Sequence, residues 1–545
     1  MDLQNKIKLI DTPIAEKIKK DNLPGLALAF TDQKDTLHVS TYGFSNLDTR
    51  TPVQPETMFE IGSIGKTFTA LLMLQEVEAG RLDLDRPVSE YLPWWRVETD
   101  YEPITPHHLL SHTAGITGGS DLAPHGYYEV FALREQKTSV PAGKYFHYSN
   151  VGFKTLGYLL EAVCGQPYGE ILQRGILDPL GMKATHSLIT LETRRLMALG
   201  YRPFYDDRPP HCTYPLTSAE WHEYGGADGS VATTPGDLAI FLRMLLNRGA
   251  YPGGQIIQID SFRLMSHGVG VIPEGGDYIF DGGCYGYGLM VKEVGGHTLV
   301  GHLGGTPGYH AVIVGDMDDG LGVTLQTNGF GDTPGIARFA LDTLRAVQLG
   351  QDPPGALTEV DHKCIEKPAE YAGVYSSKSR SFSVEAADHQ IWLVTNEGDR
   401  IMLEGRGPDL FFVNHPDFSL YLLRFERNTS SGQIEGVCYG PEWFSHSRNQ
   451  GSVEYPYPLD WEKFEGHYRS HNPWFSNFRV YIRKGNLWLG IPHGGEEQLF
   501  LVGSNSFRVG VDERSPERLT FDGFVDNRAL RATLSGCDYY RTFTP

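Results

Sequence analysis

The chain has 545 residues, of which 40% are hydrophobic and 21% are charged, and its formal net charge at pH 7 is −20. This balance is typical of globular proteins, so it excludes disorder as the main state, and the length predicts two to four domains. The acidic excess repels phosphate backbones, and the basic cluster Lys17 to Lys20 is short and is followed by Asp21. Nucleic-acid binding is therefore not expected.

No segment has the composition of a membrane anchor. Residues 1–20 mix polar and apolar side chains without the apolar centre of a signal peptide, and no run of 18 apolar residues occurs. The six cysteines lie far apart without a Cys-x-x-Cys pair, which favours reduced thiols over a disulfide framework. These features predict a cytoplasmic protein without a membrane partner, or a periplasmic or secreted one if a signal peptide has been removed.

Helical and strand patterns mix over residues 1–350. Apolar spacing and capping residues predict helices at 5–20, at 63–79, after Thr105-Pro106, after Asn150 and at 336–347. Runs bounded by glycine turns predict strands at 26–31, 36–42, 297–302, 309–315 and 321–326. The pattern favours an α+β domain in which helices flank an antiparallel sheet built from both ends of this region.

A linker at 351–367, marked by Pro353-Pro354-Gly355, separates this region from a tail of short strands. The tail contains a repeat, because Tyr371-Ala-Gly-Val-Tyr375 is similar to Phe464-Glu-Gly-His-Tyr468. Each copy continues into a strand with a central tryptophan. We predict two small antiparallel barrels of lipocalin-like type, at 368–452 and 453–545, with a single split sandwich as the alternative.

Ser63-Ile-Gly-Lys66 stands at the start of the long predicted helix. A spacing of three residues places both side chains on one helix face, where the lysine can take the proton of a serine nucleophile or hold another base. The helix N-terminus adds partial positive charge and N–H groups that stabilise an oxyanion. A bare Ser-x-x-Lys arises about once by chance in a chain of this length. A helix cap beside a solvated lysine is therefore the alternative.

Tyr148-Ser-Asn150 is the second candidate motif. A tyrosine beside a lysine ammonium can act as a general base, because the cation favours the phenolate. Asn150 can hydrogen-bond the lysine and a substrate carbonyl. The alternative is that Asn150 caps the helix that follows and that Tyr148 is an ordinary packing aromatic.

His302-Leu-Gly304-Gly305 ends a predicted strand before a tight turn. Such a strand edge can pair with an extended substrate, and the Gly305 N–H can join the N–H of Ser63 as a second oxyanion donor. Taken alone, a surface histidine beside a glycine turn explains these residues as well. The same letters recur at His493-Gly-Gly495, in a predicted hairpin turn of the tail, and there they carry no functional prediction.

In this combination and order, the three motifs resemble those of the serine β-lactamase and penicillin-binding-protein family, in its class C-like branch. That family uses Ser-x-x-Lys, then Tyr-x-Asn, then Lys-Thr-Gly or His-x-Gly. The resemblance covers about residues 1–350 and includes Met58–Gly62, His108–Gly115 and Gly225–Ser230. It implies a helical lobe near residues 70–150, with the site between this lobe and the sheet. The implied catalytic residues are Ser63, which forms an acyl-enzyme, Lys66, Tyr148 and His302, and the implied substrate-binding residues are Asn150, Gly304 and Gly305.

The third motif departs from β-lactamases and most cell-wall peptidases, which have a lysine that attracts a substrate carboxylate. Histidine is largely neutral at pH 7, so His302 argues against efficient penicillin hydrolysis and D-Ala-D-Ala carboxypeptidase activity. A histidine here is similar to D-aminopeptidases and to the esterases of this family, and two barrels after the catalytic domain are similar to the layout of the D-aminopeptidases. The resemblance therefore implies a serine hydrolase of small amides, peptides or esters that is closest to a D-aminopeptidase. A carboxyl esterase and a weak β-lactamase or DD-peptidase are the alternatives. No cofactor and no metal are implied, a small molecule or short peptide is the expected partner, and a homodimer stays open.

Other classes are disfavoured. The nucleophile elbow of an α/β-hydrolase needs Gly-x-Ser-x-Gly, and residue 61 is isoleucine. The histidines at 107, 108 and 112 lack the acidic partner that a His-Glu-x-x-His zinc site supplies. A sensor or scaffold that only binds its ligand has no need of the complete set of motifs. The acidic residues that are candidates for a substrate ammonium, or else are solvated loop charges, are Glu220, Glu223 and Asp228.

Overall fold

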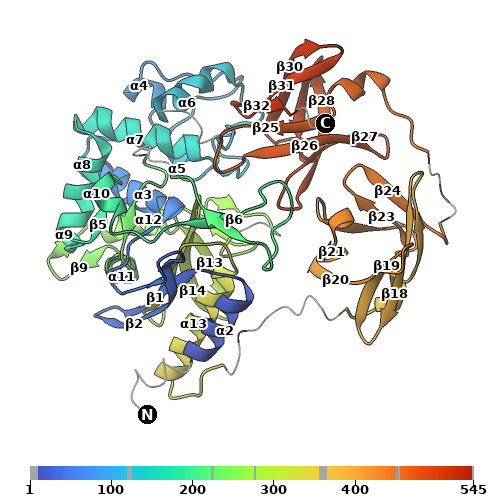
Figure 1. Cartoon of the computed structure of the whole chain (residues 1–545). Helices are drawn as coiled ribbons and strands as arrows, with labels where there is room; N and C mark the ends of the chain where they lie inside the picture. The colour runs from blue at the N-terminus through green and yellow to red at the C-terminus, as the bar shows by residue number, and fades with distance from the viewer. Residues whose placement is uncertain are drawn as a thin grey trace. The chain divides into compact units, whose positions relative to one another are not determined.

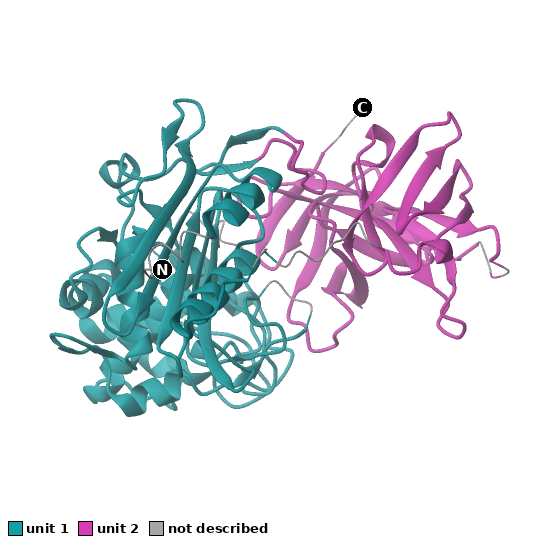
Figure 2. Cartoon of the chain, turned by 90° about the horizontal axis from the view of Figure 1, so that it is seen from below, with its two compact units in different colours: residues 1–202, 215–358 teal, residues 203–214, 359–545 magenta. Residues whose placement is uncertain are grey.

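The computed structural model describes residues 10–119, 126–221, 226–274, 278–354, 357, 365–449, 451 and 454–542. The chain forms two compact units, which Figure 2 colours separately. Unit 1 comprises Met1–Arg202 and Pro215–Thr358, and unit 2 comprises Pro203–Tyr214 and Glu359–Pro545. The predicted linker, 351–367, lies largely outside the described residues, so the predicted domain boundaries stay predictions.

Unit 1 is built on a nine-stranded antiparallel sheet with the order β11-β12-β13-β14-β15-β16-β1-β2-β3 (Figure 1). In chain order its strands are β1 (Gly25–Asp32), β2 (Thr36–Asn46), β3 (Thr51–Pro52), β11 (Gly270–Val271), β12 (Cys284–Tyr285), β13 (Met290–Val294), β14 (His297–Thr306), β15 (Tyr309–Asp316) and β16 (Leu321–Thr327). Strand β1 pairs with β16, with Leu26 opposite Thr327, so the sheet joins both ends of the unit as predicted.

Helices cover both faces of this sheet. They are α2 (Asp11–Lys20), α11 (Pro235–Leu246) and α13 (Thr333–Gln348). Helices α2 and α13 share one face, where Val312 and Val314 of β15 pack with them, whereas Ala311 and Ile313 pack with α11 on the other face (Figure 1). Because alternate residues of a strand point to opposite faces, a strand covered on both sides is apolar throughout.

The remaining described helices of unit 1 surround one apolar core, to which each of them except α10 (Leu191–Arg194) contributes a side chain. They are η2 (Gly62–Ile64), α3 (Gly65–Glu78), α4 (Val88–Tyr91), α5 (Pro106–Leu110), α6 (Gly126–Ala132), η3 (Leu133–Glu135), α7 (Asn150–Cys164), α8 (Tyr168–Leu172), η4 (Gln173–Leu177), α9 (Asp178–Leu180), α10 (Leu191–Arg194) and α12 (Ile259–Met265). Short strands accompany them: β4 (Phe59–Glu60), β5 (Thr185–His186) and β8 (Ala232–Thr233) form one sheet, β6 (Tyr201–Pro203) pairs with β7 (Leu216–Ser218), and β9 (Ala250–Tyr251) pairs with β10 (Gly254–Gln255).

Helix α3 is the central one of these helices and is buried along most of its length, with Phe68 stacked on Phe241 at a ring-centroid distance of 3.8 Å. The predicted helix at 63–79 divides into a 3₁₀ turn, η2, which contains Ser63, and α3, which ends just before Gly80. Gly80 has a φ of +69°, as expected of a glycine that ends a helix. The predicted helix at 5–20 is described from Asp11, and its first residues lie outside the described part of the chain.

Unit 2 contains two closed antiparallel barrels, as predicted, so the split-sandwich alternative was wrong. The first consists of β17 (Gly373–Ser376), β18 (Ser381–Ala387), β19 (Gln390–Thr395), β20 (Arg400–Gly407), β21 (Leu410–Val413), β22 (Leu423–Arg427), β23 (Ile434–Tyr439) and β24 (Glu442–His446). The second consists of β25 (Gly466–Arg469), β26 (Asn477–Arg483), β27 (Asn486–Gly490), β28 (Glu496–Gly503), β29 (Ser506–Val509), β30 (Arg518–Val525), β31 (Arg528–Leu534) and β32 (Cys537–Arg541). Three short 3₁₀ turns accompany them: η5 (Pro368–Glu370), η6 (Pro416–Phe418) and η7 (Leu459–Lys463).

The sequence repeat of the tail coincides with the repeat of the barrels. Its two glycines begin β17 and β25, and Trp392 and Trp488 lie in the equivalent strands β19 and β27. Buried aromatic side chains fill both interiors, among them Tyr375 in the first barrel and Tyr468 in the second, each of which donates a hydrogen bond to the carbonyl four residues earlier. The barrels are therefore packed cores rather than open carriers.

A segment from the middle of the chain, Pro203–Tyr214, belongs to unit 2 (Figure 2). Arg469, in the second barrel, donates a hydrogen bond to the carboxylate of Asp206. His211 stacks on Phe412 of the first barrel, with ring centroids 4.7 Å apart. The segment thus contacts both barrels, and the chain returns to unit 1 only after it.

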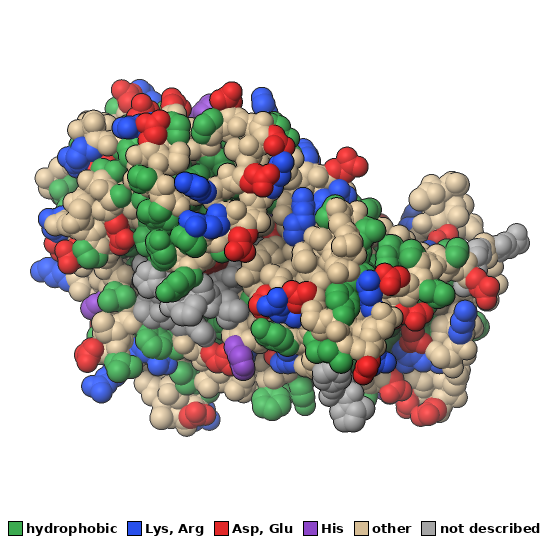
Figure 3. Space-filling model, turned by 90° about the horizontal axis from the view of Figure 1, so that it is seen from above, with side chains coloured by type: hydrophobic (Ala, Val, Ile, Leu, Met, Phe, Trp, Pro, Cys, Tyr) green, Lys and Arg blue, Asp and Glu red, His purple; other side chains and the backbone are tan. Residues whose placement is uncertain are grey.

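None of the described helices is long and apolar enough to cross a membrane. Acidic and basic side chains are interspersed over the face of the molecule that Figure 3 shows. The cysteines within the described residues are free thiols, namely Cys164, Cys212, Cys284, Cys438 and Cys537.

The sheet and the barrels confirm the predicted fold class. Helices and an antiparallel sheet form the first part of the chain, and two barrels form the tail.

Candidate active site

Ser63 and Lys66 lie together, as their spacing predicts. The 3₁₀ turn η2 presents Ser63 immediately before α3, and Lys66 follows one turn later on the same face. The Nζ of Lys66 donates a hydrogen bond of 2.9 Å to the Oγ of Ser63. The serine therefore has a neighbour that can orient its hydroxyl and receive its proton.

The ammonium group of Lys66 is enclosed by protein. The side chain is 0% exposed, and Nζ donates a second hydrogen bond of 2.7 Å to the main-chain carbonyl of Asp228. Nζ also lies 5.1 Å from the ring centroid of Tyr148 and 5.8 Å from that of Phe153, within the range of cation–π attraction. The alternative interpretation of Lys66 as a solvated charge was wrong, because no part of it is in contact with solvent.

Tyr148 and Asn150 stand at the start of α7, and the ring of Tyr148 lies beside Lys66. The N-cap of this helix is Ser149, whose Oγ accepts a hydrogen bond of 3.1 Å from the N–H of Gly152. The alternative that Asn150 is the cap was therefore wrong: Asn150 is the first helical residue, and its N–H donates to the carbonyl of Gly118. Because Ser149 satisfies the helix end, the amide side chain of Asn150 is not needed for capping.

A buried histidine that the sequence analysis connected with metal binding instead shapes this turn. The Nδ1 of His112 accepts a hydrogen bond of 3.0 Å from the N–H of Ser149, and its ring lies 4.2 Å from that of Tyr148. Burial, and secondarily the charge of Lys66, hold the pKa of His112 well below its usual range. A neutral imidazole therefore packs against the phenol of Tyr148.

His302 is buried and faces another tyrosine. Its Nδ1 donates to the carbonyl of Leu303, so its Nε2 is the acceptor of a 2.8 Å hydrogen bond from the hydroxyl of Tyr285. Burial lowers the pKa of His302 to about 3, an effect that the Leu303 hydrogen bond opposes and the charge of Lys66 reinforces. The imidazole is therefore neutral at physiological pH, and the alternative of a surface histidine was wrong.

The glycines after His302 allow β14 to approach the nucleophile. A Cβ atom on Gly304 would lie 1.7 Å from the carbonyl oxygen of Ile61. Gly62, at a φ of +48°, is in similar contact with Gly305, since its Cβ would lie 2.7 Å from the Gly305 nitrogen. The Gly305 peptide therefore lies directly against the segment that carries Ser63. The main-chain nitrogens of Ser63 and Gly305 thus belong to two segments in direct contact, which is compatible with the predicted pair of oxyanion donors.

A pocket of about 480 Å³ opens beside these residues. The described residues that line it are Ser63, Tyr148, Tyr278, Met290, His302, Leu303, Gly304, Gly305, His310, Ala311, Gly331, Thr333 and Pro334. None of them is Lys, Arg, Asp or Glu. The pocket lining described by the structure thus offers hydroxyl, imidazole and main-chain groups to a substrate, without a formal charge.

Sequence reasoning missed four groups that the structure brings to this site. Tyr278 lines the pocket, Tyr285 binds His302, the main-chain carbonyl of Asp228 binds Lys66, and His112 packs against Tyr148. His112 and Asp228 carried a signal, since each lies in a stretch that resembles the family, but the sequence did not show that the Asp228 carbonyl binds Lys66. Tyr278 and Tyr285 lie outside those stretches, and the fold brings them to the site.

The other candidate residues have structural partners. His107 Nδ1 lies 2.6 Å from the hydroxyl of Tyr287, and His108 Nδ1 accepts a hydrogen bond from the N–H of Thr105 in a capping box. Glu220 pairs with Arg202 at 3.2 Å. Glu223 lies outside the described residues.

Acid conditions are expected to destabilise the protein through His302. Its pKa is about 3 when folded and about 6.5 when unfolded, so the unfolded state binds a proton first as the pH falls. The stabilising contribution of the neutral imidazole is complete above about pH 6.5 and is lost progressively towards pH 3, with a loss of about 2 kcal/mol at pH 5. Urea unfolding at pH 7 and pH 5 measures this loss as a difference in the free energy of unfolding. In His302→Gln, which keeps an acceptor for Tyr285, the pH-dependent loss should shrink by about that amount, and an equal loss in both proteins contradicts the assignment.

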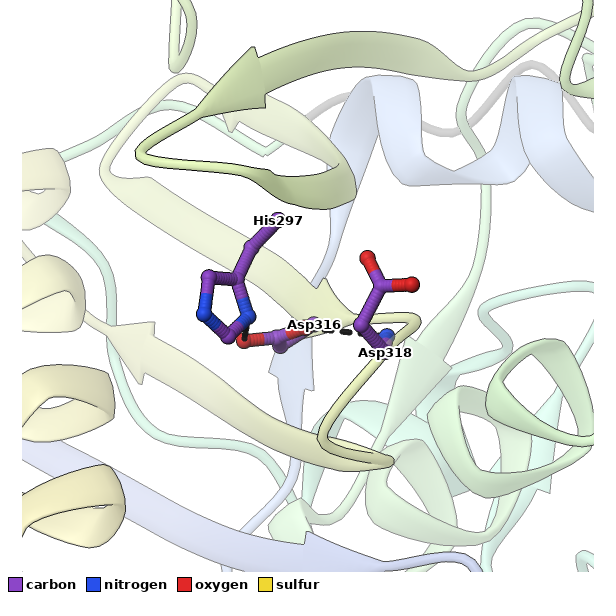
Figure 4. A group of neighbouring side chains, drawn as sticks. All are labelled: His297, Asp316 and Asp318. Atoms are coloured by element: carbon purple, nitrogen blue, oxygen red, sulfur yellow. Dashed lines mark hydrogen bonds and ion pairs between the residues drawn. The ribbon is translucent and has the colours of Figure 1, made fainter.

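One group of side chains, at the far end of β14 and β15, has the composition of a metal site. Figure 4 shows His297, Asp316 and Asp318, whose ligand atoms lie within 4.8 Å of one another. Asp316 is fully buried, and its carboxylate accepts hydrogen bonds from the N–H groups of Asp318 and Asp319 and from the guanidinium of Arg345. Burial raises the pKa of Asp316, but these hydrogen bonds outweigh it and leave the pKa below its usual value. Arg345 thus supplies the charge that a cation would bring.

Replacing Arg345 by methionine is expected to destabilise the protein by about 3 kcal/mol, because it leaves a buried carboxylate without its cation. Thermal or urea unfolding of Arg345→Met and of Arg345→Lys, which keeps the charge, measures this loss. A change below about 1 kcal/mol in Arg345→Met would contradict this expectation, since the pair would then stabilise the protein no more than an exposed ion pair does.

Comparison with known proteins is consistent with this geometry. Residues 10–346 match the family model described as Beta-lactamase. Over 323 residues the chain is 30% identical to penicillin-binding protein 4 of Amycolatopsis lactamdurans, and the match covers 56% of this chain and 81% of that protein. Penicillin-binding protein 4* of Bacillus subtilis (strain 168) is 25% identical over 455 residues, which cover 79% of this chain and 95% of that protein. Among solved structures, an octameric penicillin-binding protein homologue from Pyrococcus abyssi is similar, with a TM-score of 0.60 and 25% identity over 82% of this chain and 100% of that one.

Proposed function

The chain belongs to the β-lactamase family of serine hydrolases, and on that premise we propose that it cleaves small amides or peptides next to a free amino group, as a D-aminopeptidase does. The nucleophile in this proposal is Ser63. Lys66 and Tyr148 carry its proton, and Asn150, Gly304 and Gly305 bind the substrate. His302 holds Tyr285 and the shape of the pocket.

The proposed reaction has two half-reactions. The Oγ of Ser63 attacks the substrate carbonyl carbon as the Lys66–Tyr148 pair takes its proton, and the N–H groups of Ser63 and Gly305 stabilise the oxyanion. The pair returns the proton to the leaving amine, the C–N bond breaks, and an ester on Ser63 remains. Water then loses a proton to the same pair and attacks the ester; the bond from the carbonyl carbon to Ser63 Oγ breaks, the acid leaves, and the pair returns the proton to Ser63 Oγ.

The observation that carries the proposal is the neutral character of the pocket. The lysine that attracts a substrate carboxylate in β-lactamases is replaced by His302, which is buried, neutral and bound to Tyr285. No described residue of the lining carries a formal charge of either sign. This favours substrates without a carboxylate at that place over penicillins and D-Ala-D-Ala peptides. The net charge of −20 also attracts a cationic amine to the protein.

The same neutral pocket supports a second candidate, a carboxyl esterase, because an uncharged short-chain ester needs no ionic partner. A weak β-lactamase or DD-peptidase and a sensor that only binds its ligand are the further alternatives.

Self-association is also proposed, since the similar protein from Pyrococcus abyssi is octameric. Light scattering coupled to size-exclusion chromatography measures the molar mass in solution, and the mass of a monomer at all concentrations would contradict self-association.

A small substrate panel tests the function. It contains the p-nitroanilides of D-Ala, L-Ala and N-acetyl-D-Ala, p-nitrophenyl acetate and a chromogenic cephalosporin. We expect D-Ala p-nitroanilide to be cleaved at least about 100-fold faster than the L and N-acetyl analogues. Activity confined to p-nitrophenyl acetate would make the protein an esterase, and rapid cephalosporin cleavage would make it a β-lactamase.

A further inference from the structure

A cluster of three buried charges lies beside the active site but outside the pocket lining. The side chains of Glu129, Lys154 and Asp228 are 8%, 4% and 6% exposed. The ammonium of Lys154 forms an ion pair with the carboxylate of Glu129, and it lies 4.0 Å from the Oδ2 of Asp228. Two carboxylates thus share one lysine in the interior of the unit.

The main chain of the same Asp228 is part of the active site. Its carbonyl accepts the 2.7 Å hydrogen bond from Lys66, and Lys66 in turn donates to the nucleophile Ser63. One residue therefore connects two lysines, with its carboxylate facing Lys154 and its carbonyl facing Lys66. Lys154 is also one turn after Asn150 in α7, so both residues lie on one face of that helix.

The turn around Asp228 is wedged between α7 and the segment that carries the nucleophile. A Cβ atom on Gly157 of α7 would lie 2.5 Å from the Cβ of Ala227, and one on Gly229 would lie 3.1 Å from the main chain of Gly62. The hydroxyl of Thr69 donates to the carbonyl of Ala227. A shift of this turn therefore moves the carbonyl that holds Lys66.

We propose that Lys154 is a positioning residue for nucleophile activation: by binding the carboxylate of Asp228 it holds the carbonyl of that residue against the ammonium of Lys66. The inference rests on the proposed function, since it concerns how Ser63 is activated. A lysine is costly to bury, and an apolar residue would pack here without that cost, as Val151, Leu156 and Leu159 do elsewhere on the helix. The charge of Lys154 can bind the Asp228 carboxylate and so hold the Asp228 carbonyl in place, which an apolar side chain cannot do.

The test measures the second-order rate constant for labelling Ser63 with a fluorophosphonate, and its pH profile, on samples whose folded fraction is known from circular dichroism. In Lys154→Met we expect the constant for the folded protein to fall about 10- to 100-fold, because the reacting groups are misplaced by a fraction of an ångström. In substrate turnover, kcat should fall while KM stays within about threefold. Lys154→Arg should restore the labelling constant to within about threefold of wild type, since it keeps the charge.

Two further variants separate positioning from stability. Arg345→Met removes the cation of another buried ion pair far from the site, and we expect normal labelling of its folded fraction. The triple variant Glu129→Gln, Lys154→Met, Asp228→Asn removes the three charges of the cluster together, so it tests the proposal even if Lys154→Met does not fold, and it should label as slowly as Lys154→Met. Wild-type labelling rates in Lys154→Met or in the triple variant, or equal slowing in Arg345→Met, would overturn the inference. If wild type is not labelled at Ser63 at all, the proposed function fails instead.

Discussion

Ser63→Ala is expected to abolish covalent labelling and to lower kcat on the preferred substrate by at least about 10³-fold. The reason is that the Oγ of Ser63 accepts a hydrogen bond from Lys66 and that Ser63 lines the pocket beside the Gly305 peptide. The oxyanion donors and the proton carriers stay in place in this variant, but no acyl-enzyme can form. Mass spectrometry after fluorophosphonate treatment, together with single-turnover kinetics, measures both effects.

Ser266→Ala is a suitable control for this variant. The hydroxyl of Ser266 donates to the carbonyl of Phe262 at the end of α12, and it takes no part in the pocket. It should keep wild-type labelling and turnover. Labelling that persists in Ser63→Ala at the wild-type rate would mean that another residue is the nucleophile, and a protein that binds the probe only reversibly would be a sensor rather than an enzyme.

Gly304→Ala is expected to lower kcat/KM by about 10²- to 10³-fold. The added Cβ would lie 1.7 Å from the carbonyl oxygen of Ile61 and 3.2 Å from the nitrogen of Ser63, and both atoms belong to the main chain. Strand β14 or the nucleophile turn must therefore move by more than an ångström, on the order of a methyl radius. That movement separates the Gly305 N–H from the N–H of Ser63, so one oxyanion donor is lost. Kinetics on the substrate panel, corrected for folded fraction, measure the effect.

The second His-x-Gly motif of the chain, His493-Gly-Gly495, provides the matched control. Gly495, in His493-Gly-Gly495, lies in the turn between β27 and β28, and a Cβ atom there would meet only Ile491 side-chain atoms at ordinary distances of 3.5 Å or more. Gly495→Ala should therefore keep wild-type activity. Equal losses in Gly304→Ala and Gly495→Ala would show that the loss does not come from the contact between Gly304 and the nucleophile turn, and would remove the argument for an oxyanion donor at Gly305.

Much of the local structure could be predicted because its causes are local. The spacing of Ser63 and Lys66 places them on one helix face whatever the rest of the chain does, and the strand patterns at 26–31 and 309–315 reflect burial on both faces of a sheet. The barrel repeat was visible because each copy keeps its glycine and its tryptophan. The alternative that Asn150 caps α7 was wrong, since Ser149 and Asn150 are equally good capping residues and only the backbone bend selects one of them.

The environment of each site residue depended on partners far along the chain. The carbonyl that holds Lys66 comes from Asp228, 162 residues later, and the hydroxyl that donates to His302 belongs to Tyr285, on another strand. No spacing rule connects these positions, because a main-chain carbonyl has no residue identity and a pairing across strands is set by the register of the sheet. The residue types that carry chemistry, and their helical spacing, were therefore determined by the sequence itself. The tertiary structure alone decided which of these residues are buried, which are neutral and which are in contact. The reason is that burial and charge state depend on the side chains packed around a residue, and the motif does not contain those side chains.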